Sequence, residues 1–161
     1  MLIIESKTAS SGATEPVTLS EAQTYFRSED SDGVEDTLIN NLISAARAYI
    51  EKRTNRSLID SDLVVTFAEG FKGYLPYGPL TGTITWTDDE PASTYGEKYP
   101  YVEIDTTTKA TYSTEAYSDP QVKQAVLELA MFMYERGDFT WDSLPVKLKT
   151  SIAQFSRVPM I

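Results

Sequence analysis

The chain has 161 residues, of which 24 are acidic and 14 basic, and its formal net charge is −10. It contains neither cysteine nor histidine, which excludes disulfide bonds, thiolate nucleophiles and zinc–thiolate sites and removes the usual general base. The length fits one domain, or one domain with an insertion. The excess of acidic residues disfavours a protein that binds phosphate groups.

The first fifteen residues are predicted to form a flexible N-terminal arm. The apolar run Met1–Ile4 is followed by small and polar residues, which is typical of an arm or edge strand that continues into a tether. This start has no basic leader and no long apolar segment, so no signal peptide is expected. No run of 18 apolar residues occurs, so no membrane partner is predicted either.

A short helix is predicted after this arm. Thr18 followed three residues later by Glu21 forms a capping box, which marks a helix start. Four residues of this helix recur on one face and predict a buried side. They are Leu19, Ala22, Tyr25 and Phe26.

A longer central helix is predicted over Glu35–Arg56. Its apolar residues recur at intervals of one and three along a single face, which favours a helix over a strand. The opposite face is predicted to be polar and includes Arg47 and Glu51. The predicted buried residues are Leu38, Ile39, Leu42, Ile43, Ala46, Tyr49 and Ile50.

The acidic turn between these two helices has two interpretations. Asp30, Asp32 and Gly33 are similar to part of a calcium loop, but the template then places Ser28 and Ile39 where it requires Asp and Glu. A solvated turn that caps the following helix is the favoured interpretation. We therefore predict no metal site, and the sequence indicates no cofactor.

Residues 62–113 are predicted to form a small antiparallel β insertion. Ten of the 18 aromatic residues lie between Phe67 and Tyr117, where three basic residues stand against eight acidic ones. Such a sheet could stack nucleobases, but the charge favours an aromatic core and contacts with proteins. The predicted strands are Leu63–Phe67, Gly73–Tyr77, Thr83–Trp86, Tyr101–Ile104 and Ala110–Tyr112.

A second long helix is predicted from Pro120, with Asp119 as its N-cap, to Gly137 as its C-cap. Its apolar residues recur at three and four, so it is the predicted partner of the central helix. A last helix is predicted from about Leu144 to Gln154. The apolar tail that follows either docks on a neighbouring molecule or packs locally.

This order of elements predicts an α+β fold that is mainly α. We expect a helical bundle of about four helices, with the small antiparallel β insertion between the second and third helices. The predicted organisation is an arm, a single domain and a tail. These are residues 1–15, residues 16–158 (helical over 16–58 and 119–155, β over 62–113) and residues 156–161.

Four segments follow one another in an order that is typical of one protein family. Pro16–Ala22 opens a capped helix, Leu38–Leu58 contains most of the central helix and its end, Leu75–Trp86 forms a strand pair, and Pro120–Arg136 forms the second long helix. In this respect the chain resembles the head–tail connector (adaptor) proteins of tailed bacteriophages. Asn55 stands where that family more often has glycine, although asparagine also tolerates the left-handed conformation.

The resemblance implies a structural, non-enzymatic virion protein in the neck, at the head–tail interface. Such a protein would form a ring of twelve copies on the portal protein, extend the DNA channel, and present a surface to a downstream neck or tail-completion protein. It would be made and assembled in the host bacterial cytoplasm. Double-stranded DNA would pass an acidic lumen without specific binding, and a heterologous contact that closes on itself would form the ring.

Seven residues are candidates for contacts between subunits. The arginines among them are expected to form ion pairs, either within the chain or with a neighbouring copy. The others are aromatic or apolar and lie in the last third of the chain. The candidates are Arg47, Arg53, Tyr134, Arg136, Phe155, Met160 and Ile161.

Two alternatives stay open. One is another phage neck or tail-completion component with a similar fold. The other is a hydrolase that uses paired carboxylates, which would need two carboxyl groups about 5 to 10 Å apart across a cleft. Some of the available carboxylates lie in a predicted turn. The others share one face of a predicted strand, where the sequence gives no sign of a pocket. They are Asp88, Asp89, Glu90, Glu103 and Asp105.

Overall fold

The computed structural model describes residues 1–27, 33–88, 91, 93–137 and 139–157, and the chain divides into two units. A sheet unit consists of Met1–Thr14 and Arg56–Tyr117, and a helical unit consists of Glu15–Asn55 and Ser118–Ile161. The chain therefore crosses from one unit to the other three times.

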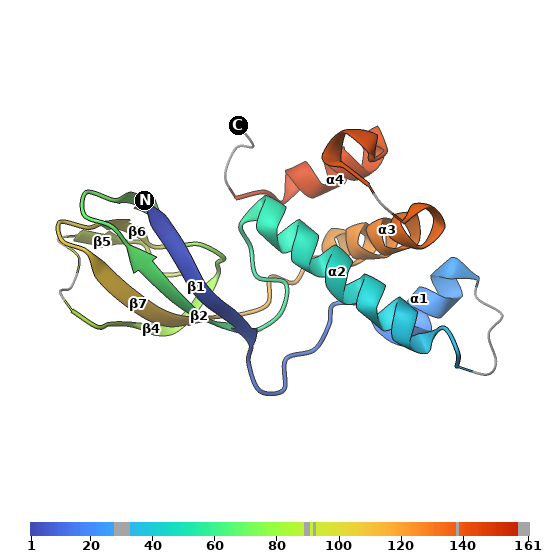
Figure 1. Ribbon diagram of the computed structural model, residues 1–161, viewed down its shortest axis with the longest axis horizontal. Coiled ribbons are helices and arrows are strands. Elements are labelled where there is room, and N and C mark those ends of the chain that lie inside the picture. Colours follow the sequence, from blue (N-terminus) through green and yellow to red (C-terminus); the bar gives the residue numbers. More distant parts are fainter. Residues whose placement is uncertain (28–32, 89–90, 92, 138, 158–161) are drawn as a thin grey trace. The chain divides into compact units, whose positions relative to one another are not determined.

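The helical unit is built around two long helices (Figure 1). The second and third helices pack against each other as predicted, and the first and last helices each pack against both of them. The core between them is aliphatic, with Ile39, Ile43, Ile50 and Leu129 at most 1% exposed. The elements are α1 (Leu19–Phe26), α2 (Asp36–Thr54), α3 (Pro120–Arg136), the 3-10 turn η1 (Trp141–Ser143) and α4 (Val146–Gln154).

The predicted capping signals of these helices are confirmed. The Thr18 hydroxyl accepts a hydrogen bond from the Glu21 backbone N–H at 3.3 Å, and the Glu21 carboxylate accepts one from the Thr18 backbone N–H at 2.9 Å. Asp119 caps α3 by accepting from the Gln121 backbone N–H at 2.8 Å. Asn55 ends α2 in the left-handed conformation, with φ 54°.

Replacing Thr18 with Ala is expected to lower the free energy of unfolding by about 1 kcal/mol, because the first turn of α1 loses its side-chain acceptor. Urea unfolding followed by circular dichroism measures this change. Thr24→Ala is the matched control: its hydroxyl bonds only to the Ser20 carbonyl within the same helix, so little change is expected. Equal losses in the two variants would contradict the capping role.

The predicted polar face of α2 is partly wrong. Glu51, placed on that face, is 2% exposed, whereas Leu38, placed in the core, is 49% exposed. The burial of Glu51 is possible because Arg47, one turn earlier, donates a hydrogen bond to its carboxylate at 2.7 Å. A buried charge is tolerated when it is paired in this way.

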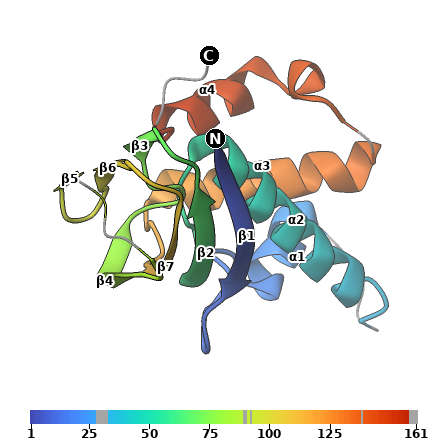
Figure 2. The ribbon, with the colours of Figure 1, turned by 60° about the vertical axis from the view of Figure 1, so that its left-hand side comes forward.

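The sheet unit contains two antiparallel sheets, which Figure 2 shows with their labels. The four-stranded sheet has the order β1-β2-β7-β4, and the three-stranded sheet has the order β3-β6-β5. Buried and exposed residues alternate along β2, so Leu63, Val65 and Phe67 enter the core. The strands are β1 (Leu2–Ala9), β2 (Ser61–Phe67), β3 (Lys72–Tyr74), β4 (Leu80–Trp86), β5 (Ser93–Tyr95), β6 (Tyr101–Glu103) and β7 (Thr108–Thr114).

The prediction of a mainly α fold with a small β insertion is wrong. The chain is 38% helical and 27% strand, with the strands in two antiparallel sheets, so the fold is a mixed α+β fold. One reason is β1, which lies outside residues 62–113 and pairs with β2 from Leu2 opposite Phe67 to Ala9 opposite Ser61. Another is β5, a three-residue strand next to Gly96 that the sequence pattern did not reveal.

Candidate functional site

The described residues show no acidic metal site. Among them, no group of three or more histidine, cysteine, aspartate or glutamate side chains could hold an ion. Asp30 and Asp32 of the weighed calcium loop lie outside the described residues. No helix of the described part is long and apolar enough to cross a membrane.

The carboxylates weighed for hydrolysis lie at the surface of the sheet unit where the structure describes them. Glu103 forms an ion pair with Lys72 at 3.3 Å on the surface of the three-stranded sheet, and Asp88 and Asp105 are exposed. Asp89 and Glu90 lie outside the described residues. The geometry therefore gives the hydrolase alternative no support.

Arg47 is held inside the helical unit by two carboxylates. Its guanidinium contacts Glu15 at 2.8 Å and Glu51 at 2.7 Å, and its side chain is only 15% exposed. Burial acts to lower the pKa of Arg47, but the hydrogen bond with Glu15 and the attraction of Glu51 outweigh it, so the pKa is raised. The ion pairs of Arg47 thus lie within the chain. The sequence had left open whether they form within the chain or with a neighbouring copy.

Arg53 and Arg136 each lie over an aromatic ring of the same unit. The Arg53 guanidinium is 4.2 Å from the centre of the Trp141 ring, and that of Arg136 is 5.4 Å from the centre of the Phe132 ring. Both arginines are exposed, so their charge is also accessible to another molecule. Their role as subunit contacts stays a prediction.

The other candidate contacts are placed differently. The Tyr134 hydroxyl donates to the Glu35 carboxylate, with both carboxylate oxygens at 3.0 Å, and Tyr134 is 37% exposed. Phe155 ends α4 and is only 4% exposed, so it packs inside the helical unit. Met160 and Ile161 lie outside the described residues.

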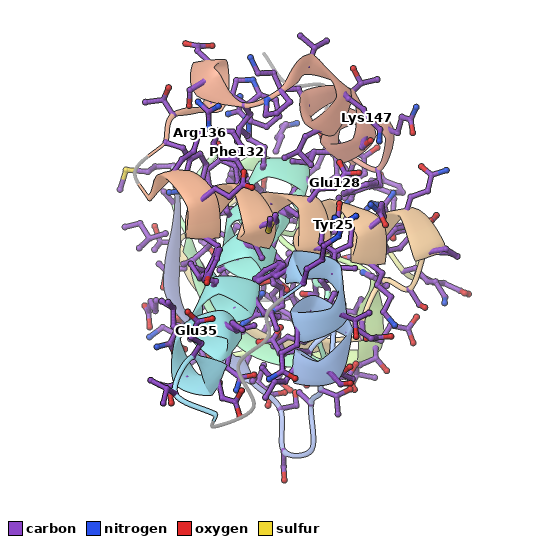
Figure 3. All side chains as sticks on the ribbon, turned by 90° about the vertical axis from the view of Figure 1, so that its right-hand side faces the viewer. Tyr25, Glu35, Glu128, Phe132, Arg136 and Lys147 are labelled. Carbon is purple, nitrogen blue, oxygen red and sulfur yellow. The ribbon has the colours of Figure 1, made fainter. Side chains whose placement is uncertain are left out.

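The helical unit carries a groove of about 320 Å³ between α1, α3 and α4. Tyr25 forms the α1 wall, and Phe132 and Glu128 lie along α3 (Figure 3). Lys147, at the start of α4, approaches Glu128 to 3.3 Å. A second hollow of about 260 Å³ lies on the α1 side of Tyr25 and is lined mostly by apolar atoms.

Sequence reasoning did not find this groove. It assigned Tyr25 to the buried face of the first helix, but Tyr25 is 39% exposed. The exposure depends on how α3 and α4 pack beside α1, which no local pattern records. The spacing of apolar residues locates the core, whereas the residual hollows between packed helices depend on tertiary contacts.

An ion pair between Lys123 and Glu21 links α3 to α1. The Lys123 ammonium donates to the Glu21 carboxylate, and Glu21 also belongs to the capping box of α1. The bond from Lys123, followed by that from the Thr18 backbone N–H, lowers the pKa of the Glu21 carboxyl from 4.5 to about 2. Glu21 therefore stays ionised in the folded protein at pH values where an ordinary glutamate is protonated.

This lowered pKa predicts an acid-dependent link between α1 and α3. Because the folded pKa lies below the unfolded one, the contribution of Glu21 to stability is complete above about pH 4.5 and is lost as the pH falls through about 2. NMR titration of the Glu21 carboxyl should give a midpoint near pH 2. Lys123→Met should raise this midpoint, whereas Lys149→Met, whose ammonium bonds to the Asp142 carbonyl, should leave it unchanged.

Comparison with known proteins gives a likeness in structure. No protein-family model and no curated protein matches the sequence. A chain from the neck of an empty gene transfer agent (GTA) particle, computed with C6 symmetry, matches with a TM-score of 0.68 at 21% identity, covering 100% of this chain and 97% of that chain. The chain folds like a protein of such a neck.

Two further solved structures agree with this finding. A chain from the virion of a native gene transfer agent particle matches at 18% identity with a TM-score of 0.68, over 100% of this chain and 97% of that one. A chain from the native GTA neck, computed with C12 symmetry, matches at 20% identity with a TM-score of 0.58, over 92% and 97%. The resemblance to neck proteins of phage-like particles is thus confirmed at the level of the fold.

Proposed function

We propose that this protein is a structural component of the neck of a phage-like particle. In this role it is a head–tail connector that forms a closed ring on the portal protein and extends the DNA channel toward the tail. The observation that carries the proposal is the fold, which matches a GTA neck chain over nearly the whole length of both chains. The four sequence segments that resemble phage connectors support the same assignment.

The proposed ring is supported by the symmetry of the compared particles. Their necks were computed with C6 and C12 symmetry, which twelve equivalent subunits satisfy. A ring of copies needs two different, complementary faces on each subunit, because a heterologous contact repeated by rotation closes on itself. Exposed charged groups such as Arg53 and Arg136 are candidates for these faces.

The proposed passage of DNA is supported by charge. A net charge of −10 per chain gives a ring little affinity for phosphate groups, and stable DNA binding requires lysine and arginine to replace the counterions of DNA. An acidic lumen would let double-stranded DNA move during packaging and ejection without specific binding. In the proposed function the protein binds no cofactor and performs no catalysis.

Mixing the full chain with rings of the cognate portal protein tests this function. Negative-stain microscopy and mass measurement should show a second ring stacked on the portal, and the portal alone is the control. A chain that stays monomeric and does not bind the portal would contradict the proposal. A monomer in isolation would not, because assembly can require the portal as template.

A second candidate is another neck or tail-completion component. It is favoured by one observation, namely that the compared structures are described only as a neck or a virion. Locating the labelled chain in particles by electron microscopy separates the two. A layer directly against the portal supports the connector, whereas a layer further toward the tail supports the second candidate.

A further inference from the structure

The three-stranded sheet carries a row of three tyrosines on one face. Tyr74 of β3 and Tyr95 of β5 are both register partners of Tyr101 on the middle strand β6. Side chains of directly paired residues point to the same face of a sheet. The Tyr74 and Tyr101 rings are 5.3 Å apart at 83°, which is an edge-to-face arrangement. The register places Tyr95 beside Tyr101 on the third strand (Figure 2 shows these strands).

This row faces outward from the sheet unit. Tyr74 is 52% exposed and Tyr95 is 59% exposed, whereas Val102, the next residue after Tyr101, is fully buried on the opposite face. The rings of Tyr74 and Tyr95 are therefore not part of the buried core of the sheet unit. Exposed tyrosines in a cluster are typical of protein interfaces, because they bury a large area at a low cost in conformational entropy.

The sheet unit that carries the row is acidic as a whole, which favours a basic partner. By the printed sequence, the sheet unit has eleven acidic and five basic residues. Its lysines at 72, 98 and 109 are paired with glutamates, and Lys7 and Arg56 lie over tyrosine rings. Glu97, two residues after Tyr95, is exposed. Tyrosine rings and glutamate together attract a lysine or arginine through cation–π and ionic contacts.

One segment of the chain itself has the complementary character. Residues 143–157 contain three basic and no acidic residues, although the whole chain is strongly acidic. Within this segment Val146 is 77% exposed. The Lys147 ammonium lies 3.3 Å from the Glu128 carboxylate, but its side chain is 82% exposed and can also contact a neighbouring molecule. Thr150 and Ala153 follow at helical spacing and are also exposed. They form a stripe of small side chains, with Lys147 beside it, that suits packing on aromatic rings.

We propose that the tyrosine row of one copy receives the exposed face of α4 of a neighbouring copy. The dimensions agree, because nine helical residues extend about 13 Å and the outer strands of a three-stranded sheet are about 10 Å apart. Since the two surfaces differ, the contact is heterologous and can repeat around a ring. The inference rests on the proposed ring and names the faces through which it forms.

Disulfide mapping in the full chain tests this contact, and the natural absence of cysteine makes the result unambiguous. One batch carries Tyr95→Cys and another carries Val146→Cys; they are mixed under assembly conditions with portal rings and oxidised. The pair should cross-link between chains at least tenfold more than Val146→Cys mixed with Thr85→Cys, which lies exposed on β4. A disulfide requires the Cα atoms to come within about 7 Å.

Microscopy of the unmodified chain, carried out in parallel, distinguishes a failure of this contact from a failure of the proposed function. Rings without the 95–146 cross-link would overturn this contact and leave the connector function standing. A cross-link without rings would support the contact and count against the function. The absence of both would overturn both. A disulfide within one chain, seen when both cysteines are placed in the same molecule, would also overturn the contact between copies.

Association strength gives a second readout. Tyr95→Ala should weaken self-association on the portal about tenfold or more, whereas Tyr25→Ala, an exposed tyrosine of the helical unit, should not. Glu97→Lys and Lys147→Glu should each weaken it, and a chain that carries both should recover. Normal rings from Tyr95→Ala that fail to bind the portal would assign the tyrosine row to the portal and overturn the proposal.

Discussion

Replacing Arg47 with Ala is expected to lower the free energy of unfolding by about 3 to 5 kcal/mol. The Glu51 carboxylate that Arg47 contacts at 2.7 Å has a side chain only 3% exposed. Without the guanidinium this buried carboxylate loses its ion pair with Arg47, and Glu15 loses its own ion pair while it keeps its hydrogen bond from Ser44. Urea unfolding at pH 7, followed by circular dichroism at a helix wavelength, measures the loss.

The control for this prediction is Arg53→Ala on the same helix. Arg53 is exposed and stacks on Trp141, so its removal should cost only about 0.5 to 1 kcal/mol. The double variant Arg47→Met with Glu51→Leu removes both charges and should be more stable than Arg47→Ala alone. If Arg47→Ala costs no more than Arg53→Ala, the buried pair is not a determinant of stability.

Replacing Phe67 with Ala should lower the stability of the sheet unit by about 3 to 5 kcal/mol. Phe67 is fully buried, and its ring centre lies 5.0 Å from that of Phe71 and 6.0 Å from that of Trp86. The variant leaves a cavity between these rings. Fluorescence of Trp86 during urea unfolding, in a Trp141→Phe background, measures the loss directly in this unit.

Thr66→Ala is the matched control in the same strand. Its hydroxyl donates to Glu5 at the surface at 2.5 Å, and its loss should change stability by about 0.5 kcal/mol or less. A comparable loss in both variants would mean that strand formation, and not packing of the Phe67 ring, dominates the energetics of β2.

The helices could be predicted because their signals are local. The Thr18 and Glu21 capping box, the Asp119 cap and the apolar spacing of α2 and α3 each lie within a few residues of the element that they define. The burial of Glu51 could not be predicted in this way. Arg47 and Glu51 are one turn apart, but the guanidinium that pairs with Glu51 is also bound by Glu15, which is far from both in sequence.

The β content was underestimated for a related reason. Leu2–Ala9 becomes a strand because β2 offers it an edge, and the partners Leu2 and Phe67 are 65 positions apart. Ser93–Tyr95 is too short for its alternation to stand out. The groove beside Tyr25 and the tyrosine row depend on which strands and helices become neighbours in space. The sequence pattern identifies the residues of each element but does not show that residues of different elements lie close together.

The three crossings of the chain between its units affect how the protein can fold during synthesis. When β1 leaves the ribosome it has no partner until β2 follows some sixty residues later, and α2 waits for α3 until Pro120 has emerged. The sheet unit can therefore be completed only after Glu15–Asn55 of the helical unit has been synthesised, and the helical unit only after the whole sheet unit has been synthesised. Nascent chains of this protein should stay incompletely folded until late in translation, which makes chaperone binding at that stage advantageous.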